Sequence, residues 1–203
     1  NMNKRLMLGN EAIARGAWEA GVNVVSSYPG TPSTEITEYC ARYPEIHTEW
    51  ATNEKVATEV CAGASAAGAR AMCCMKHVGV NVAADPLYTA AYTGVNGALV
   101  LACADDPGMH SSQNEQDSRY HALASQVLML EPSDSLECKE FTKAAFDLSE
   151  RFDTPVMVRT TTRVAHARSL VSLEPRREVP IKPYEKNAKK YVMMPAMARS
   201  RHI

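Results

Sequence analysis

Several sequence signatures of common protein classes are missing from these 203 residues. No apolar run reaches the roughly 18 residues that a membrane-spanning helix requires. Lys and Arg together number 22 and Asp and Glu 23, so the net charge is −1 and the chain lacks the bulk positive charge that attracts nucleic acid or an anionic membrane surface. We therefore expect a protein that binds neither nucleic acid nor a membrane.

Common catalytic and metal-binding motifs are also absent. The sequence contains no Gly-x-Gly pair, no Gly-x-Ser-x-Gly segment and no Cys-x-x-Cys pair, which are typical of dinucleotide-binding proteins, serine hydrolases and redox sites respectively. The six histidines are not spaced as metal ligands, and we expect no metal site in this chain. The six cysteines lie mostly in apolar or alanine-rich stretches, and the N-terminus has no signal-peptide core, so we expect reduced thiols and a cytoplasmic protein.

What the sequence does contain is a regular alternation of short β-rich segments with longer segments of helical character. The β-rich segments span residues 22–28, 45–50, 70–75, 97–104, 126–131 and 154–160. The helical segments span residues 9–20, 32–43, 53–69, 80–93, 117–124 and 133–151. This alternation predicts an α/β fold with a mostly parallel sheet and helices on both faces.

The domain organisation follows from a change of composition near residue 162. Residues 1–162 carry the β–α alternation, and we expect them to form one domain. Residues 163–203 are rich in Arg, Lys and Pro, which is typical of a linker or an extended arm leading toward further domains. In a parallel sheet the functional loops follow the carboxyl ends of the strands, here residues 28–32, 50–54, 76–79 and 105–110.

These loops carry the residues of a known family. Residues 27–35, Ser-Tyr-Pro-Gly-Thr-Pro-Ser-Thr-Glu, resemble the Tyr-Pro-x-Thr-Pro-Ser segment of 2-oxoacid:ferredoxin oxidoreductases, and residues 53–71 resemble the helix that contacts thiamine in the same superfamily. Residues 75–87, beginning Met-Lys-His-Val-Gly-Val-Asn, are similar to the alpha subunit of the indolepyruvate ferredoxin oxidoreductases, whereas pyruvate-type relatives carry a Thr-Ser-Gly-Pro-Gly-like loop there. Residues 9–16 and 105–117 fit that subunit too, so the resemblance covers about residues 6–160.

The resemblance implies a pyrimidine-binding domain for thiamine diphosphate in the oxidative decarboxylation of an aryl 2-oxo acid to acyl-CoA with reduction of ferredoxin. It also implies what lies elsewhere. The family's Gly-Asp-Gly…Asn motif, which holds the diphosphate through Mg²⁺, and its Cys-x-x-Cys clusters for 4Fe-4S centres do not occur here. We expect a fragment that has no activity alone, whose partners are the remaining alpha-subunit domains, a beta subunit, ferredoxin and the 2-oxo acid, and which forms a homodimer.

Individual residue roles follow from the same resemblance. Glu54 is the expected catalytic carboxyl, which hydrogen-bonds the pyrimidine nitrogen N1′ and drives the tautomer that the chemistry needs. Gly30 leaves room for the cofactor, and Thr31 is a candidate donor to the substrate carboxylate or, alternatively, the cap of the following helix.

A second loop supplies further candidates. Lys76 and His77 are expected to bind the substrate carboxylate or assist proton transfer, and His77, Val78 and Gly79 to contact the cofactor; a purely structural or solvated Lys-His pair is the alternative. The polar loop that follows Asp105 and Asp106 is either a subunit contact or cofactor-edge loop, or a plain surface turn.

Two other functions remain open on the sequence alone. One is a non-catalytic ligand-binding or subunit-assembly module with a decayed thiamine site, against which the presence of Glu54 argues. The other is a cysteine-dependent α/β hydrolase, for which the sequence offers neither a nucleophile elbow nor a matched Cys/His pair.

Overall fold

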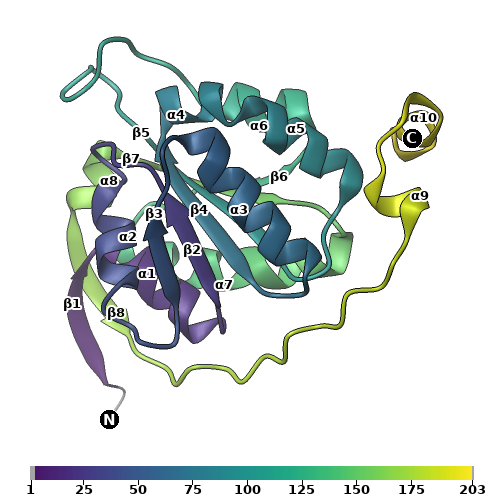
Figure 1. The fold of residues 1–203 in the computed structure, drawn as a ribbon. Coiled ribbons are helices and arrows are strands. Elements are labelled where there is room, and N and C mark those ends of the chain that lie inside the picture. Colours follow the sequence, from purple (N-terminus) through teal and green to yellow (C-terminus); the bar gives the residue numbers. More distant parts are fainter. Residues whose placement is uncertain (1–2, 203) are drawn as a thin grey trace.

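A six-stranded parallel sheet forms the centre of the computed structural model, which describes residues 3–202 (Figure 1). The strands lie in the order β3-β2-β4-β5-β7-β6, and every neighbouring pair is parallel. Their bounds are His47–Trp50 (β3), Val24–Ser27 (β2), Ala71–Lys76 (β4), Leu99–Asp105 (β5), Val156–Thr161 (β7) and Leu128–Leu130 (β6). The two central strands, β4 and β5, are buried at every residue, as expected of parallel strands covered on both faces.

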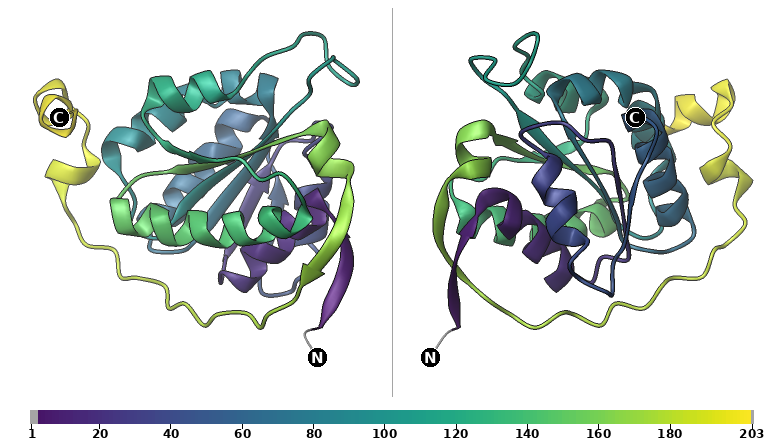
Figure 2. Two further views of the ribbon diagram at one scale, coloured as in Figure 1. Left: turned by 180° about the vertical axis from the view of Figure 1, so that it is seen from behind. Right: turned by 60° about the vertical axis from the view of Figure 1, so that its left-hand side comes forward.

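Helices cover both faces of this sheet (Figure 2). One face packs against α1 (Gly9–Glu19), α2 (Thr34–Cys40) and α7 (Ser135–Phe152), and the other against α3 (Glu54–Ala66), α4 (His77–Val82), α5 (Ala84–Thr93) and α6 (Arg119–Ser125). Because side chains alternate along a strand, Cys74 lies in the first core and Cys73 in the second. The predicted α/β fold is therefore confirmed, and both cysteines pack in the core.

The predicted helices differ from the observed ones in one place that matters for the site. The sequence predicts a single helix over residues 80–93, whereas the structure has α4 beginning at His77, directly after β4, followed by α5. Residues 77–79 are thus the first turn of a helix and not a loop. Gly79 and Val80 consequently face the protein interior and are buried.

Two strands that the sequence does not predict pair at the border of the domain. β1 (Lys4–Leu8) lies antiparallel to β8 (Arg168–Ser172), and α8 (Thr162–His166) precedes β8. α8 packs closely on α1, and a Cβ atom at Gly9 would collide with the Val164 carbonyl oxygen. Residues 163–172, which the sequence assigns to the arm, therefore continue the packed domain.

The chain after β8 is extended and crosses the edge of the sheet at which the strands begin (Figure 1). The Arg177 amide donates to the Glu19 carbonyl at 2.9 Å, and the Lys182 amide donates to the Gly68 carbonyl at 3.0 Å. α9 (Ala188–Tyr191) and α10 (Pro195–Arg201) end the described chain near α5, where Arg201 Nε donates to the Tyr92 carbonyl at 2.9 Å. The segment over residues 173–202, called the arm below, is thus an extended arm held along its length by the domain.

The described residues, 3–202, also bear on membranes, metals and disulfides. None of their helices combines the length and apolar character needed to cross a membrane. No group of three His, Cys, Asp or Glu side chains gathers there as a metal ion would require. All six cysteines are free and buried.

Candidate functional site

Glu54 is the first residue of α3 and follows the carboxyl end of β3. Asn53 starts this helix, because its Oδ1 accepts a hydrogen bond from the Val56 amide at 2.9 Å, which is the usual N-cap arrangement. Glu54 is only 9% exposed, and within residues 3–202 its carboxyl group forms no ion pair and no hydrogen bond to another side chain. A largely buried side chain whose carboxyl oxygens have no protein partner is suited to bind a polar group of a ligand.

Gly79, in the first turns of α4, faces this carboxyl group. A Cβ atom at position 79 would lie 2.7 Å from Glu54 Cγ and 2.8 Å from Oε1, closer than real Cβ atoms approach other atoms. The Glu54 carboxyl group can therefore occupy its position only because residue 79 has no side chain. Neighbouring Val78, an expected cofactor contact, is half-buried.

Gly30 forms a tight turn after β2, beside Lys76 at the end of β4. Its amide donates to Thr34 Oγ1 at 2.8 Å, and its carbonyl accepts from the amide and hydroxyl of Ser33. A Cβ atom at position 30 would lie 2.9 Å from Lys76 Cδ, so Gly30 gives the Lys76 stem its space. Thr31 is exposed, and because α2 is preceded by Ser33 as its N-cap residue, the alternative reading of Thr31 as that cap is wrong.

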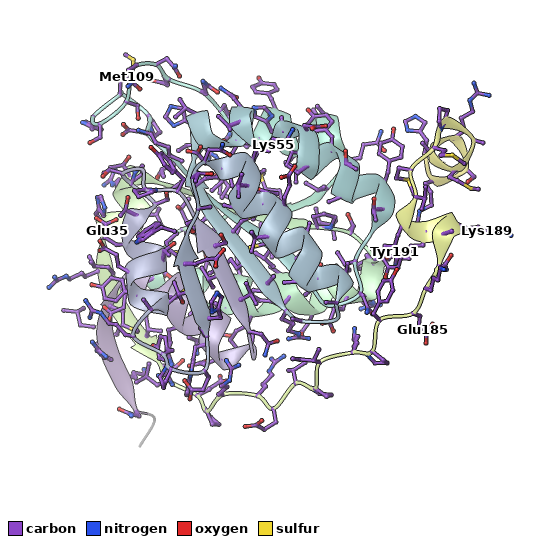
Figure 3. All side chains as sticks on the ribbon, in the orientation of Figure 1. Glu35, Lys55, Met109, Glu185, Lys189 and Tyr191 are labelled. Carbon is purple, nitrogen blue, oxygen red and sulfur yellow. The ribbon has the colours of Figure 1, made fainter. Side chains whose placement is uncertain are left out.

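Lys76 and His77 both point to the loop over residues 107–117, which connects β5 with α6. Lys76 Nζ donates to the Ser111 carbonyl at 2.8 Å, and His77 Nε2 lies 3.0 Å from the Asn114 carbonyl. Since a carbonyl only accepts, Nε2 carries the ring hydrogen, and the buried Nδ1 has no partner among the described residues. In Figure 3, Met109 lies at the outer end of this loop, away from the helices.

Two aspartates fix the base of the loop. Asp105 is fully buried and accepts from Arg159 Nε at 2.8 Å and from the Ser118 amide at 2.9 Å. Asp106 accepts from the Ser111 amide at 2.7 Å and from the hydroxyls of Ser112 and Thr162, each at 2.8 Å. Burial opposes ionisation of Asp106, but these hydrogen bonds prevail and lower its pKa to about 2.

The structure thus brings the sequence candidates together in two contacts at one sheet edge, Glu54 with Gly79 and Gly30 with Lys76. It does not place the Thr31 side chain in contact with another candidate. Sequence reasoning missed Ser111 and Asn114, because the groups that hold Lys76 and His77 are backbone carbonyls, which every residue type has. A separate hollow of about 480 Å³ between α5 and α10 includes none of these residues.

Comparisons of the chain with known proteins point to one family. The family described as pyruvate flavodoxin/ferredoxin oxidoreductase, thiamine diphosphate-binding, matches residues 15–202. The chain is 49% identical to indolepyruvate oxidoreductase subunit IorA of Archaeoglobus fulgidus, over 97% of this chain and 33% of that protein. It is 48% identical to the subunit of the same name from Methanothermobacter marburgensis, over 97% of this chain and 32% of that protein.

A solved structure shows the same fold. The 2-oxoglutarate:ferredoxin oxidoreductase from Magnetococcus marinus superposes with a TM-score of 0.77 at 23% sequence identity, covering 85% of this chain and 32% of that one. The chain spans about a third of the length of the curated relatives named above. It belongs to the thiamine diphosphate-binding domain family of the pyruvate flavodoxin/ferredoxin oxidoreductases.

Proposed function

We propose that this chain is the pyrimidine-binding half of a thiamine diphosphate site in an enzyme that oxidises an aryl 2-oxo acid, of the indolepyruvate type, to acyl-CoA and CO₂ and reduces ferredoxin. The observation that carries the proposal is Glu54, a largely buried residue at a helix start whose carboxyl oxygens have no protein partner among the described residues and face a glycine. The aryl preference is supported by the names of the relatives and by residues 76–79, which depart from the pyruvate-type loop.

The residues at this edge fit an aminopyrimidine ring. Glu54 is suited to hold a proton against the ring nitrogen N1′, and Gly79 keeps the carboxyl where the ring would meet it. When bound, thiamine diphosphate supplies a nucleophilic carbon that adds to the keto group of a 2-oxo acid. The remaining work of this chain is positioning: Gly30 gives the Lys76 stem its space, the exposed Thr31 would border the ligand, and Lys76 and His77 would offer donors for the substrate.

The rest of the machinery belongs to chain segments and subunits outside this sequence. Mg²⁺, the diphosphate grip, the 4Fe-4S clusters and the CoA site require motifs that residues 1–203 do not contain. We therefore expect no turnover from this chain alone. Assembly with the remaining domains of a longer subunit, and with a second subunit, is part of the proposal, and the chain's one-third coverage of its relatives supports it.

Calorimetry with thiamine diphosphate and Mg²⁺ on the full-length enzyme tests this function. Glu54→Ala is expected to weaken cofactor binding and abolish turnover. Glu59→Ala changes an exposed glutamate on the same helix and serves as the matched control, with binding and turnover unchanged. If the unaltered enzyme does not bind the cofactor, the non-catalytic module with a decayed site becomes the better reading.

A further inference from the structure

We propose that Lys76 is the receptor for the carboxylate of the 2-oxo acid, and that the Ser111 carbonyl holds its ammonium group until the substrate displaces it. The inference rests on the proposed function and deepens it, because it assigns the charged end of the substrate to one residue. It also gives the loop over residues 107–117 a role, because this loop supplies the carbonyl that the substrate carboxylate replaces.

The first observation is a buried cation without an anion. Lys76 is 8% exposed. Within residues 3–202, lysine ion pairs with Asp or Glu involve Lys55, Lys139, Lys143, Lys182 and Lys190, and not Lys76. Burying an ammonium group is costly unless it is paired. An ammonium with three donors and one neutral carbonyl as its protein partner is therefore prepared to accept an anion.

The second observation is that the position of the ammonium is restricted. The Lys76 stem passes directly over Gly30, where even a methyl group would stand 2.9 Å from Cδ and 3.1 Å from Cγ. Lys76 is also the last residue of a fully buried central strand. The positive charge therefore stays at the sheet edge near Thr31 and the start of the Glu54 helix. An anion that pairs with it has to bind at this edge.

The third observation concerns the loop that supplies the carbonyl. Its base is fixed by the hydrogen bonds of Asp106 to Ser112 and Thr162, whereas residues 107–111 are exposed. The Asn114 carbonyl of the same loop accepts a hydrogen bond from His77 Nε2 at 3.0 Å. The loop therefore covers two donors with neutral backbone acceptors, while the Ser111 amide is itself held by Asp106 at 2.7 Å.

A carboxylate replaces such a carbonyl favourably. A hydrogen bond between an ammonium and a carboxylate is roughly twice as strong as one to a neutral acceptor. A neutral ligand gains no such advantage and leaves the Ser111 carbonyl in place. The arrangement thus selects for ligands with an acid group next to the reacting carbon, as a 2-oxo acid has.

Binding of two matched, unreactive ligands to the full-length enzyme loaded with thiamine diphosphate tests the proposal. Indole-3-propionate has a methylene in place of the keto group of indole-3-pyruvate and keeps the carboxylate, and indole-3-propionamide lacks the charge. We expect Lys76→Met to weaken propionate binding about 10- to 100-fold, the loss of a charged hydrogen bond. Propionamide binding is expected to stay the same, and Lys76→Arg to retain part of the preference for the acid.

Two controls separate this inference from the proposed function. Lys189→Met removes an exposed lysine on α9 and is expected to change neither affinity. Thiamine diphosphate binding by Lys76→Met at the wild-type affinity shows that the variant is folded and that the cofactor site is intact. Failure of the unaltered enzyme to bind the cofactor contradicts the proposed function, whereas failure confined to the acid preference contradicts this inference.

Hydrogen exchange of the loop amides provides a readout that does not depend on turnover. Propionate is expected to accelerate exchange across residues 107–116 in the wild type, because the Ser111 carbonyl loses its partner, and to leave exchange unchanged in Lys76→Met. Equal losses of propionate and propionamide affinity in Lys76→Met, or a loop that exchanges identically with and without propionate, would overturn the proposal.

Discussion

The α-carbon of Gly79 faces the carboxyl group of Glu54 so closely that a side chain at position 79 would need the space Oε1 occupies, 2.8 Å from a Cβ atom. The two residues come from different helices, α4 and α3, that begin at the ends of separate strands. The Glu54 carboxyl group can therefore take its position only because Gly79, a residue of another helix, has no side chain. This relationship can be tested without touching the carboxyl group itself.

Gly79→Ala should impair the site while the protein stays folded. The added methyl group pushes the Glu54 side chain aside, and misplacement of a reacting group by about 1 Å can cost about 10²-fold in rate. Turnover and thiamine diphosphate affinity of the full-length enzyme measure the effect. Gly63→Ala is the matched control, because a Cβ atom there meets nothing within 4 Å, and alanine in a helix adds up to about 1 kcal/mol of stability.

Glu54→Gln should slow catalysis with little change in shape. An amide keeps the size of the side chain but does not share a proton with N1′, and positioned proton transfer contributes about 10²–10⁴-fold. Exchange of the thiazolium C2 proton of bound cofactor, followed by NMR, should slow together with turnover. Exchange at the wild-type rate in the variant would show that another group supplies the proton.

Gly68→Ala should release the arm from the domain. Gly68 has a φ of +96°, and a Cβ atom there would collide with the Lys182 carbonyl oxygen, so the arm must move away. We expect a loss of about 1 kcal/mol or more in stability and faster proteolysis within residues 176–186. Thermal unfolding and limited proteolysis measure these effects, and an unchanged cleavage rate would show that the contact with Gly68 does not hold the arm.

The hydrogen bonds of Asp106 should make the loop base sensitive to acid. The folded-state pKa of about 2 lies below the ordinary value of 3.8, so the ionised carboxylate contributes fully above pH 3.8, and the contribution is lost as the pH falls toward 2. The depression corresponds to at most about 2 kcal/mol. Urea unfolding should show Asp106→Asn as less stable than the wild type at neutral pH, with the difference shrinking as the pH falls. A difference that is constant across this range would contradict the assignment.

Self-association is the last expectation, and it remains a prediction. Apolar side chains stay exposed on or beside the strand-end loops, namely Tyr28, Trp50, Val56 and Met109. Exposed apolar surface of this kind promotes association, and a two-fold pair covers one such patch most simply. Light scattering of the purified chain should give a dimer with the strand-end loops protected from hydrogen exchange. A monomer at high concentration, with these loops no more protected than the arm, contradicts it.

Much of the fold was predictable because it follows from local patterns. The near-continuous apolar segment of residues 97–104 indicates a strand buried on both faces, and it forms most of β5. Asn53 before Glu54 is a recognisable helix start, and it places the carboxyl at the end of β3. The single break between α4 and α5 was missed, because the apolar spacing of residues 80–93 continues across it.

The sequence by itself determined the order of the six strands of the main sheet along the chain and which residues follow their ends, since hydrophobic period and capping residues act over a few positions. Only the tertiary structure decided that Gly79 faces Glu54, that the Ser111 carbonyl holds Lys76, and that β1 pairs with β8. These contacts join segments that are distant in sequence, and two of the three use backbone atoms that are the same in every residue. Residue type therefore carries little signal for them, and the packing of the whole chain sets them.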